Sequence, residues 1–467
     1  METQTYIVCV LLLVAHSLTV ANPIEKSKCE CDHTKLINRG AFPGGFIFGA
    51  ASSAYQYEGA FSENGKGMGM WDNFTHMYQD KIVDHSNGDT AIDSYHLYKE
   101  DVKIARDLGL DAYRISISWS RILPGGTIKE GVNQEGIDYY NNLINELLAN
   151  GVEPFVTILH FDIPQALQEA YGGFLSAQIV ADFLDFANLL FQQFGDRIKY
   201  WITINEPWTF SVYGYAYGLF APGRCSNWQG LNCTGGNSAT EPYVVAHNQL
   251  LAHSAAVNLY RNKYQALQKG MIGIALISYW FEPLDNTNEN HKAKDRALDF
   301  MLGWFMEPLT LGKYPENMRV RVGDRLPEFT KEEINMVKGS FDFIGFNYYG
   351  AIYAYNKPNS SSFSYTTDSE IDITGIDEAA NDTLDISKAI KDEIRKDYIH
   401  DHLCCLHEAF EKYGVNVKGY FVWSLMDNFE WGAGSVNINH GGGRGGKNSV
   451  SSAGKNGHDH CEGNHPL

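Results

Sequence analysis

Short runs of β-branched and aromatic residues alternate along the chain with longer stretches in which apolar residues recur every three or four positions. The short runs predict buried strands and the longer stretches predict amphipathic helices. The predicted strands lie at 44–53, 112–119, 153–160, 200–207, 271–279, 341–349 and 419–425, and the clearest helices at 94–108, 138–150, 177–195 and 387–413. Alternating units without a visible linker or repeat indicate one α/β domain.

The number of predicted strands is one short of a (β/α)8 TIM barrel, which has eight. The shortfall falls in the polar segment 351–385, where the pattern predicts neither a strand nor a helix. A doubly wound open sheet is the alternative fold, but no Gly-x-Gly-x-x-Gly sequence follows the first strand to favour it. We therefore expect a TIM barrel that is incomplete around its seventh strand.

Charge and hydropathy restrict the partners and the compartment. The 37 basic and 56 acidic residues give a net charge of −19, which argues against a nucleic-acid or anionic-membrane partner because phosphates would be repelled. The apolar run Tyr6 to Ala15 is too short to span a bilayer, which needs about 20 residues. It fits the core of a secretory signal peptide with a small-residue cleavage site at Thr19-Val20-Ala21, although METQT before it lacks Lys and Arg. Residues 1–21 are the expected signal peptide.

Sequons and cysteines agree with secretion to the cell exterior, the cell wall or the vacuole. Glycosylation is expected at four N-x-[ST] sites, Asn73, Asn232, Asn359 and Asn381. Cys225 and Cys233 close a short Gly- and Asn-rich loop, which suits a disulfide in an oxidising compartment. Cys9 would leave with the signal peptide, and no obvious partner exists for Cys29, Cys31, Cys404, Cys405 and Cys461. Because no pair of C-x-x-C motifs is present, no metal site is expected.

Polar and aromatic residues gather where the predicted strands end, which is where function lies in a parallel barrel. Glu206 is the strongest functional candidate, because a Glu between Asn and Pro at a strand end, flanked by two tryptophans, has little structural purpose. A histidine or tryptophan alone is more often structural, but the mixture predicts a sugar site: aromatic faces stack on C–H surfaces while amides and imidazole bond hydroxyls. The set comprises Gln56, His160, Asp162, Asn205, Glu206, Asn347, Tyr348, Tyr349, Trp423, Asp427, Glu430 and Trp431.

Five motifs in these regions resemble, in order, those of plant β-glucosidases of glycoside hydrolase family 1. They are FPGGFIFGAASSAYQYEG, YRISISWSRILP, TILHFDIPQAL, WITINEPW and GYFVWSLMDNFEW, and they run from about Phe42 to Trp431. The resemblance implies a (β/α)8 barrel that hydrolyses β-glucosides with an apolar aglycone, and no cofactor is expected. It also implies a retaining mechanism, in which one carboxylate attacks the anomeric carbon while a second protonates the leaving oxygen and then activates water.

The resemblance assigns roles residue by residue. Glu206 matches the catalytic acid/base. Asn347 and Tyr349 match the pair beside the nucleophile, where the tyrosine hydrogen-bonds the nucleophilic carboxylate. The loop disulfide of the family matches Cys225 and Cys233. The residues that match the glucose-binding set are Gln56, His160, Asn205, Trp423, Glu430 and Trp431.

The family's nucleophile lies in an I-T-E-N-G motif at the end of strand seven, and this motif is absent here. The nearest sequence, Ile373 to Glu378, resembles the motif with its Glu-Asn excised, and the preceding helix and strand are missing too. We therefore expect a barrel domain over 22–431 with a deletion near 350–376. The polar, Gly-rich tail 432–467 replaces the family's final helix and is expected to be disordered.

Loss of the nucleophile leaves three hypotheses: a β-glucosidase by ancestry, a non-catalytic sugar-binding relative, or a non-functional splice product. Glu206 alone can protonate a leaving group, and its pKa is expected to be lower than in a relative whose nucleophile raises it. Chance substitution is not expected from the acids near the junction, Glu370, Asp372, Asp377 and Glu378, since a nucleophile needs a rigid setting. The aglycone and the oligomeric state are left open.

Overall fold

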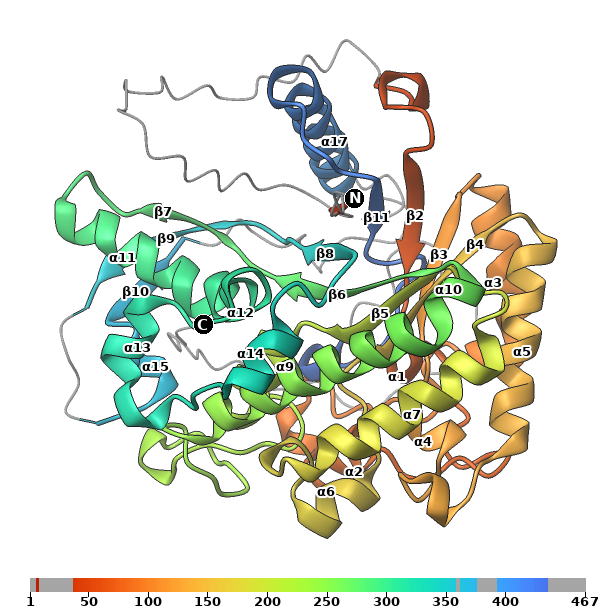
Figure 1. The fold of residues 1–467 in the computed structure, drawn as a ribbon, viewed down its shortest axis with the longest axis horizontal. Helices are drawn as coiled ribbons and strands as arrows, with labels where there is room; N and C mark the ends of the chain where they lie inside the picture. The colour runs from red at the N-terminus through yellow and green to blue at the C-terminus, as the bar shows by residue number, and fades with distance from the viewer. Residues whose placement is uncertain (1–5, 8–36, 358–361, 376–392, 436–467) are drawn as a thin grey trace, which may run out of the picture.

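A curled parallel sheet forms the centre of the molecule (Figure 1), in a computed structural model that describes residues 6–7, 37–357, 362–375 and 393–435. Its strand order is β1-β8-β6-β5-β4-β3-β2-β11, and every neighbouring pair is parallel. The seven predicted strands are all confirmed, as β2 (Ile47–Ala51), β3 (Ala112–Ser116), β4 (Glu153–Leu159), β5 (Tyr200–Asn205), β6 (Met271–Ile277), β8 (Phe343–Asn347) and β11 (Gly419–Val422).

The concave side of the sheet is filled by one layer of apolar side chains to which each of these strands contributes. Such a cluster forms only if the sheet curls, because side chains of strands at opposite ends of a flat sheet would not meet. The layer consists of Ala112, Phe155, Ile202, Ala275 and Phe343, against which Ile47 and Phe421 pack. The sheet is therefore the curled part of a barrel, as expected from the sequence.

Helices surround the outside of the sheet and bury the larger apolar cluster between themselves and the strands. The predicted helices are confirmed as α3 (Ser94–Asp107), α5 (Gln134–Ala149), α7 (Gln178–Phe194) and α17 (Glu393–Tyr413). The remaining helices are α1 (Ala54–Tyr57), α2 (Met70–Met77), α4 (Trp119–Ile122), α6 (Gln165–Tyr171), α8 (Pro207–Tyr215), α9 (Glu241–Leu259), α10 (Gln265–Gln268), α11 (Asn288–Leu298), α12 (Trp304–Leu311), α13 (Glu316–Val322), α14 (Lys331–Val337) and α15 (Tyr365–Asp368).

The barrel is open between β8 and β11. In a closed barrel these edges would flank the seventh strand, but within the described residues no strand pairs with both of them. The short β1 (Tyr6–Ile7) pairs with β8 alone, through Phe343 and Ile344. On the other side of the opening, α17 packs against the segment that leads into β2.

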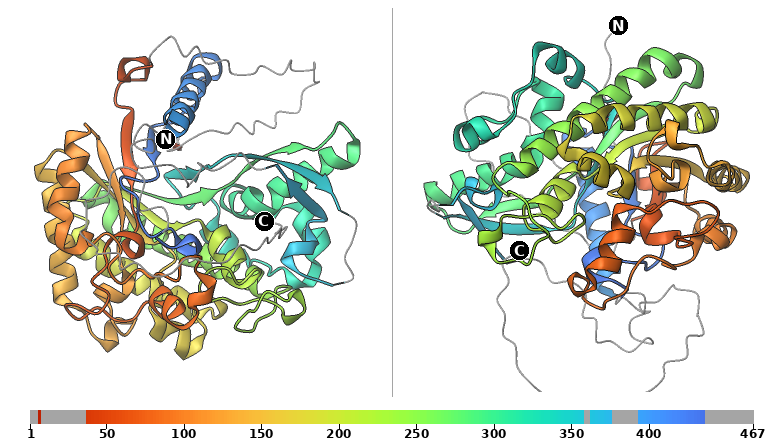
Figure 2. Two further views of the ribbon diagram at one scale, coloured as in Figure 1. Left: turned by 180° about the vertical axis from the view of Figure 1, so that it is seen from behind. Right: turned by 90° about the horizontal axis from the view of Figure 1, so that it is seen from below.

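The segment after β8 is folded, so the prediction that it contains neither strand nor helix was wrong. It forms β9 (Ala351–Asn356), α15 and β10 (Ile371–Thr374), and β9 pairs with both β10 and β7 (Trp280–Pro283). The small sheet extends to the side opposite α3 and α5 (Figure 2). Its apolar positions, such as Ile352 and Ala354, cluster with Ala297 of α11 and with Ile277 at the end of β6. Only tertiary packing of this kind explains strands in so polar a segment.

The cysteines show one confirmed prediction and one error. The Cys225–Cys233 disulfide is present, with a Cα–Cα separation of 5.5 Å. Cys404 and Cys405, for which the sequence suggested no partner, are both disulfide-bonded. Spacing along the chain does not identify the partner of a cysteine.

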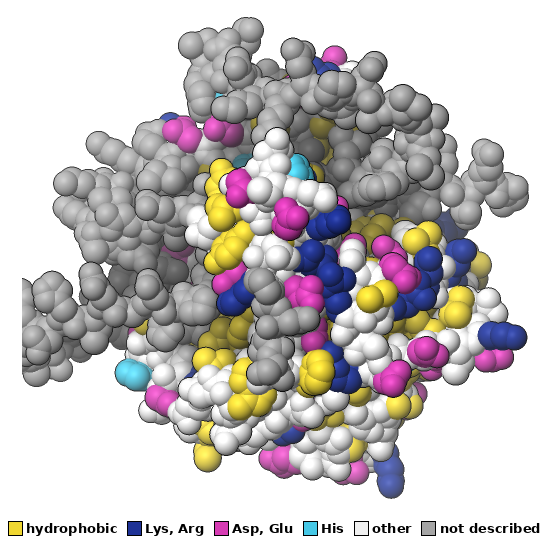
Figure 3. Space-filling view, turned by 90° about the vertical axis from the view of Figure 1, so that its left-hand side faces the viewer, with side chains coloured by type: hydrophobic (Ala, Val, Ile, Leu, Met, Phe, Trp, Pro, Cys, Tyr) yellow, Lys and Arg dark blue, Asp and Glu magenta, His cyan; other side chains and the backbone are white. Residues whose placement is uncertain are grey.

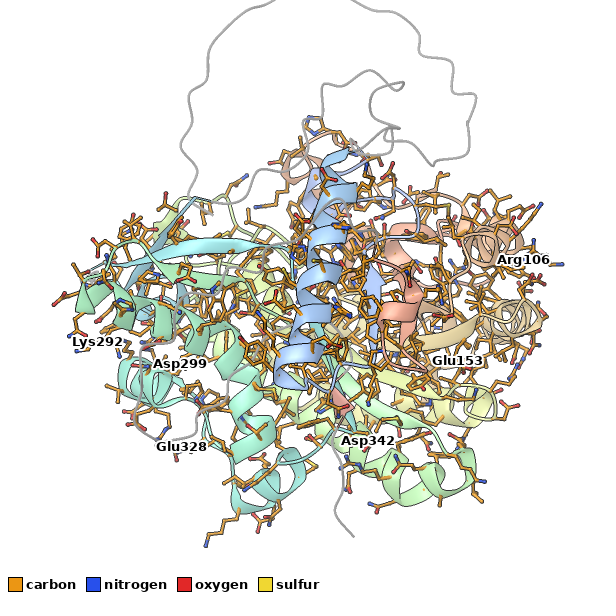
Figure 4. The ribbon with its side chains drawn as sticks, turned by 90° about the horizontal axis from the view of Figure 1, so that it is seen from above. Arg106, Glu153, Lys292, Asp299, Glu328 and Asp342 are labelled. Atoms are coloured by element: carbon orange, nitrogen blue, oxygen red, sulfur yellow. A yellow bond between two sulfur atoms is a disulfide. The ribbon has the colours of Figure 1, made fainter. Side chains whose placement is uncertain are left out.

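Several predictions lie outside the described residues: most of the signal peptide 1–21, the tail from 436, and the sequons at Asn359 and Asn381. Within the described residues, no helix is long and apolar enough to cross a membrane. Acidic and basic side chains are interspersed on the face shown in Figure 3, and Arg106 and Lys292 lie at opposite ends of the molecule (Figure 4).

A buried ion pair connects α4 to the residue that follows α1. Arg121, whose side chain is fully buried, donates from Nε to Oε2 of Glu58 at 2.8 Å and from Nη2 to the carbonyl of Gly59 at 3.0 Å. Tyr140 donates its hydroxyl to the other carboxylate oxygen. Because Glu58 is buried, these partners replace most of the hydration that its carboxylate loses on folding.

We expect Arg121→Met to lower the free energy of unfolding by about 3–5 kcal/mol, because the apolar stem is kept while Glu58 loses its counter-charge. Arg319→Met, which removes an exposed partner of Glu316, is the matched control and should change it by less than about 1 kcal/mol. Chemical denaturation measures both. Equal, small losses in the two variants would show that the buried pair does not stabilise this wall of the barrel.

Candidate active site

Glu206 lies directly after β5, at the amino end of α8. Its φ of +40° is uncommon for a residue with a side chain, and Pro207 at the first helical position sets the direction in which the chain continues. Both carboxylate oxygens are held: Thr209 donates its hydroxyl to Oε2 at 2.7 Å, and Asn347 donates its amide to Oε1 at 2.5 Å. The carboxyl group therefore has a fixed position between β5 and β8.

Burial raises the pKa of Glu206 above its ordinary value, because the ionised form loses its hydration. The hydrogen bonds from Asn347 and Thr209 oppose this shift, as does the positive charge of Arg114. A carboxyl group that keeps its proton to a higher pH is suited to proton donation. The rise comes from burial and not from the charge of another carboxylate. Whether the pKa is lower than in an intact relative stays a prediction.

Gln56 and Glu430 form the wall of the site between α1 and the segment after β11. The Gln56 amide, which is fully buried, donates to Oδ1 of Asn428 and to the Phe429 carbonyl, both at 2.8 Å, and to Oε2 of Glu430 at 3.3 Å. Burial raises the pKa of Glu430 to about 7, and the charge of Glu206 adds to the rise. Glu206 and Glu430 are therefore close enough for the charge of Glu206 to raise the pKa of Glu430.

His160 and Asn205 form the floor of the site. Arg114, inside the barrel, donates from Nη2 to Oδ1 of Asn205 at 2.7 Å, and the Asn205 amide lies 3.2 Å from Nε2 of His160. Burial, with the charge of Arg114 second, holds the pKa of His160 well below its ordinary value, so the ring is neutral. With Nε2 facing the Asn205 amide, the proton lies on Nδ1, a buried donor for which the described residues offer no partner.

Aromatic rings cover this floor. The ring of His160 is nearly parallel to Trp423, at 5.6 Å between centroids, and to Trp431, at 5.9 Å. Tyr349 is 46 % exposed, and desolvation together with the charges of Glu206 and Glu430 raises the pKa of its phenol well above the usual value. The indoles and the phenol give the site apolar surfaces beside hydrogen-bonding groups.

The structure brings together the nine residues predicted for catalysis and glucose binding, through the contacts above: Gln56, His160, Asn205, Glu206, Asn347, Tyr349, Trp423, Glu430 and Trp431. Asp162 acts one layer further out, because its Oδ1 accepts the backbone N–H of His160 at 3.2 Å. Tyr348 points elsewhere, toward His402 of α17. It is therefore not part of this site.

The acids near the junction lie away from Glu206 wherever the structure describes them. Glu370 pairs with Arg321 at 3.4 Å, and Asp372 on β10 pairs with Lys357 at 2.8 Å. Thr374, from the sequence that resembles the nucleophile motif, lies on β10 in the small sheet and not at the end of a barrel strand. Asp377 and Glu378 lie outside the described residues.

Three residues that orient the side chains of the site were not predicted from the sequence: Arg114, Thr209 and Asn428. Arg114 carried a detectable signal, because a charged residue in the middle of an otherwise buried strand needs a partner. Thr209 and Asn428 carried none, since a short polar residue near a helix start or in a loop is common everywhere. Their role depends on contacts with Glu206 and Gln56 that only the fold creates.

Comparison with known proteins agrees with this arrangement. The model of the family "Glycosyl hydrolase family 1" matches residues 38–377 and 365–441 of the chain. The chain is similar to Beta-glucosidase 12 of Oryza sativa subsp. indica, with 53 % identity over 445 residues that cover 85 % of this chain and 87 % of that protein.

Solved structures show the same likeness in three dimensions. A rice β-glucosidase, Os3BGlu6, superposes with a TM-score of 0.82 and 45 % identity, covering 85 % of this chain and 93 % of that one. A family 1 β-glucosidase from the fungus Humicola insolens, solved in complex with glucose, gives a TM-score of 0.82 at 36 % identity, covering 85 % and 92 %. The curled sheet described above is thus the barrel of these proteins.

The raised pKa of Glu430 predicts a pH-dependent stability. Between pH 4.5 and about 7 the folded state holds a proton that the unfolded state has lost, so stability falls as pH rises through this interval. The difference between the ordinary pKa of 4.5 and the raised pKa of about 7 corresponds to about 3 kcal/mol in the free energy of unfolding. Glu430→Gln should remove that part of the pH dependence.

Urea denaturation at pH 5 and pH 7.5 measures this difference. Glu289→Gln, at an exposed position on α11, is the control and should keep the parent's dependence. If Glu430→Gln and the parent lose stability in parallel across this range, the Glu430 carboxyl is ionised in the folded protein and the assignment is wrong.

Proposed function

The chain belongs to glycosyl hydrolase family 1 and is a β-glucosidase-type glycoside hydrolase, and we propose that its site binds the glucose unit of a β-glucoside and presents Glu206 as the proton donor. The observation that carries the proposal is the buried Glu206 carboxyl, fixed by Thr209 and Asn347 and raised in pKa by its surroundings. A protonated carboxyl at the glycosidic oxygen supplies general acid catalysis as the bond to the anomeric carbon breaks.

The surrounding groups suit the recognition of a hexose. The Nδ1–H of His160 is an unpaired donor, and Glu430 supplies an acceptor whose geometry Gln56 fixes. Trp423 and Trp431 supply flat apolar surfaces for the C–H faces of the ring. We assign these residues, with Asn205, to the glucosyl unit, and Asn347 and Tyr349 to the side of the site from which a nucleophile would act.

The second carboxylate of a retaining pair, expected about 5–5.5 Å from the acid, is the part that we propose is missing. Residues 375–392 connect β10 to α17, and the sequence of this connection does not contain the I-T-E-N-G motif of the family's nucleophile. The two stretches matched by the family model overlap at 365–377, which is consistent with a break in this region. The opening between β8 and β11 is where the missing strand would lie.

A non-catalytic sugar-binding role is the second candidate, and it is favoured by the complete set of glucose-binding residues around an unassisted acid. A non-functional splice product is the third hypothesis. Titration calorimetry with glucose separates them, because a sugar-binding relative retains affinity that Gln56→Ala removes, whereas an unfolded product shows none.

We also propose that the protein enters the secretory pathway and that its substrates carry apolar aglycones. The apolar leader, the described sequons at Asn73 and Asn232, and the Cys225–Cys233 disulfide support the location. Tyr213, Tyr217 and Trp208 cluster beyond Glu206 and provide the aromatic surroundings that an apolar aglycone would need.

Azide tests the missing nucleophile directly. With a nitrophenyl β-glucoside we expect very slow hydrolysis in buffer and turnover that rises with azide concentration, because azide forms the bond to the anomeric carbon that no carboxylate can form. Glu206→Gln should lower the azide-dependent rate by about 10²–10⁴ for a poor leaving group, since the proton donor is lost. Glu289→Gln should leave it unchanged.

Rapid hydrolysis without azide would overturn the missing-nucleophile proposal. Azide-dependent turnover that survives Glu206→Gln with a poor leaving group would instead overturn the role of Glu206. Glucose binding without turnover in either condition would favour the sugar-binding alternative.

A further inference from the structure

A cavity of about 240 Å³ lies beside the active-site wall, between α2, α6 and the disulfide loop. Its lining combines apolar side chains with three amides, two hydroxyls and one guanidinium. The lining residues are Met70, Asn73, Phe74, Tyr78, Gln165, Gln168, Pro222, Arg224 and Thr234. No residue proposed for catalysis or glucose binding is among them, so the cavity is separate from the active site.

The walls of the cavity are held by backbone contacts. The backbone N–H of Met70 donates to the carbonyl of Ile163 at 2.8 Å, and Gly69 forms an antiparallel bridge with Pro164, which fixes α2 against α6. On the other side, a Cβ at Gly223 would lie 2.8 Å from Cε2 of Phe74, so only glycine lets the disulfide loop approach this closely. The cavity is therefore a built feature and not a gap between loose loops.

The uncharged polar side chains around the cavity are amides and hydroxyls. Gln165 and Gln168 line it, and the Asn73 amide makes no hydrogen bond with the described residues. The one charged group, Arg224, is neutralised by two hydrogen bonds to Glu241 at 2.7 and 2.9 Å. Neutral amides beside apolar side chains fit a neutral ligand rich in hydroxyl and amide groups, such as a sugar unit.

We propose that Asn73 carries an N-linked glycan whose first N-acetylglucosamine occupies this cavity, an inference that rests on the proposed entry into the secretory pathway. Asn73, Phe74 and Thr75 form a sequon on α2. The bond forms between Nδ2 of Asn73 and C1 of a lipid-linked pyrophosphate oligosaccharide. The C1–O bond to pyrophosphate breaks, and Nδ2 loses one proton. The attached sugar then starts on the wall of the cavity.

Modification must come before folding. The hydroxyl of Thr75, which the transferring enzyme needs to reach, is fully buried and lies 2.9 Å from the Tyr55 hydroxyl and 3.0 Å from the Trp71 carbonyl. The glycan would therefore be added to the emerging chain, and α2 would fold with the sugar already in place. Trp71 packs on Trp431 at 4.6 Å, so a sugar that steadies α2 also steadies one wall of the active site.

Asn232 provides an internal comparison. It is a sequon residue in the disulfide loop, but its side chain is exposed, does not line the cavity, and has only Asp80 at 3.4 Å. A glycan on Asn232 would therefore start in solvent. Asn73 and Asn232 therefore differ in their surroundings, although both belong to N-x-[ST] sequons of the same chain and would be modified in the same host.

Expression of the full chain in a eukaryotic secretory host, followed by glycopeptide mapping, tests the occupancy. We expect a glycan at Asn73. Asn73→Gln should then lower the melting temperature by about 2–4 °C, because a ligand that fills the cavity is lost, whereas Asn232→Gln should leave it unchanged. Enzymatic trimming of the glycans to a single N-acetylglucosamine should leave the melting temperature of the parent unchanged, because the seated sugar remains.

The rate at which the sugar–asparagine bond is cleaved tests whether the sugar lies in the cavity. An amidase that removes whole N-glycans should act on the native protein at least tenfold more slowly at Asn73 than at Asn232, and equally fast after denaturation. Gln168→Leu should reduce the protection at Asn73 alone. Equal native rates at both sites, or an unmodified Asn73 in a protein glycosylated at Asn232, would overturn the proposal. A protein without any glycan would overturn the proposed secretion and this inference, while leaving the proposed sugar site untouched.

Discussion

Hydrogen bonding between parallel strands is the constraint on which the site depends, because residues of the site lie at or after the carboxyl ends of the paired strands. The ladder that pairs β4, β5 and β6 sets the positions of His160, Asn205 and Glu206. The pairing of β8 with β6 brings Asn347 to the acid, and the pairing of β11 with β2 brings Glu430 to Gln56. Strand register therefore sets the positions of the groups at the strand ends, and the segments that follow β2 and β11 add Gln56 and Glu430.

The same dependence explains how the loss that we propose, of one strand, would remove one function and leave the others. Glu206 receives its hydrogen bonds from Thr209 and Asn347, and its pKa is raised by burial, so its setting does not need the seventh strand. The nucleophile of a retaining pair has no such alternative, because its position is the end of that strand. The expected result is a site that recognises the sugar and donates a proton but lacks the group that forms the covalent intermediate.

Much of this arrangement was readable from the sequence. The seven strands and the cluster around Glu206 were predicted because β-branched runs and strand-end polar residues are local signals. The errors concern properties that depend on the whole fold. The segment that forms β9 and β10 is too polar to predict as a sheet until Ile352 and Ala354 are seen packing on α11. Cys404 and Cys405 are each disulfide-bonded, and their spacing along the chain did not indicate it.

The anomeric configuration of the azide product tests the central claim most directly. If the acid is present and the nucleophile is missing, azide takes the place of the carboxylate and attacks from the face opposite the leaving group. The product from a β-glucoside, identified by NMR, is then α-glucosyl azide. Formation of β-glucosyl azide would mean that azide intercepts a covalent glycosyl-enzyme, and it would contradict the account by showing that a nucleophilic carboxylate is still in place.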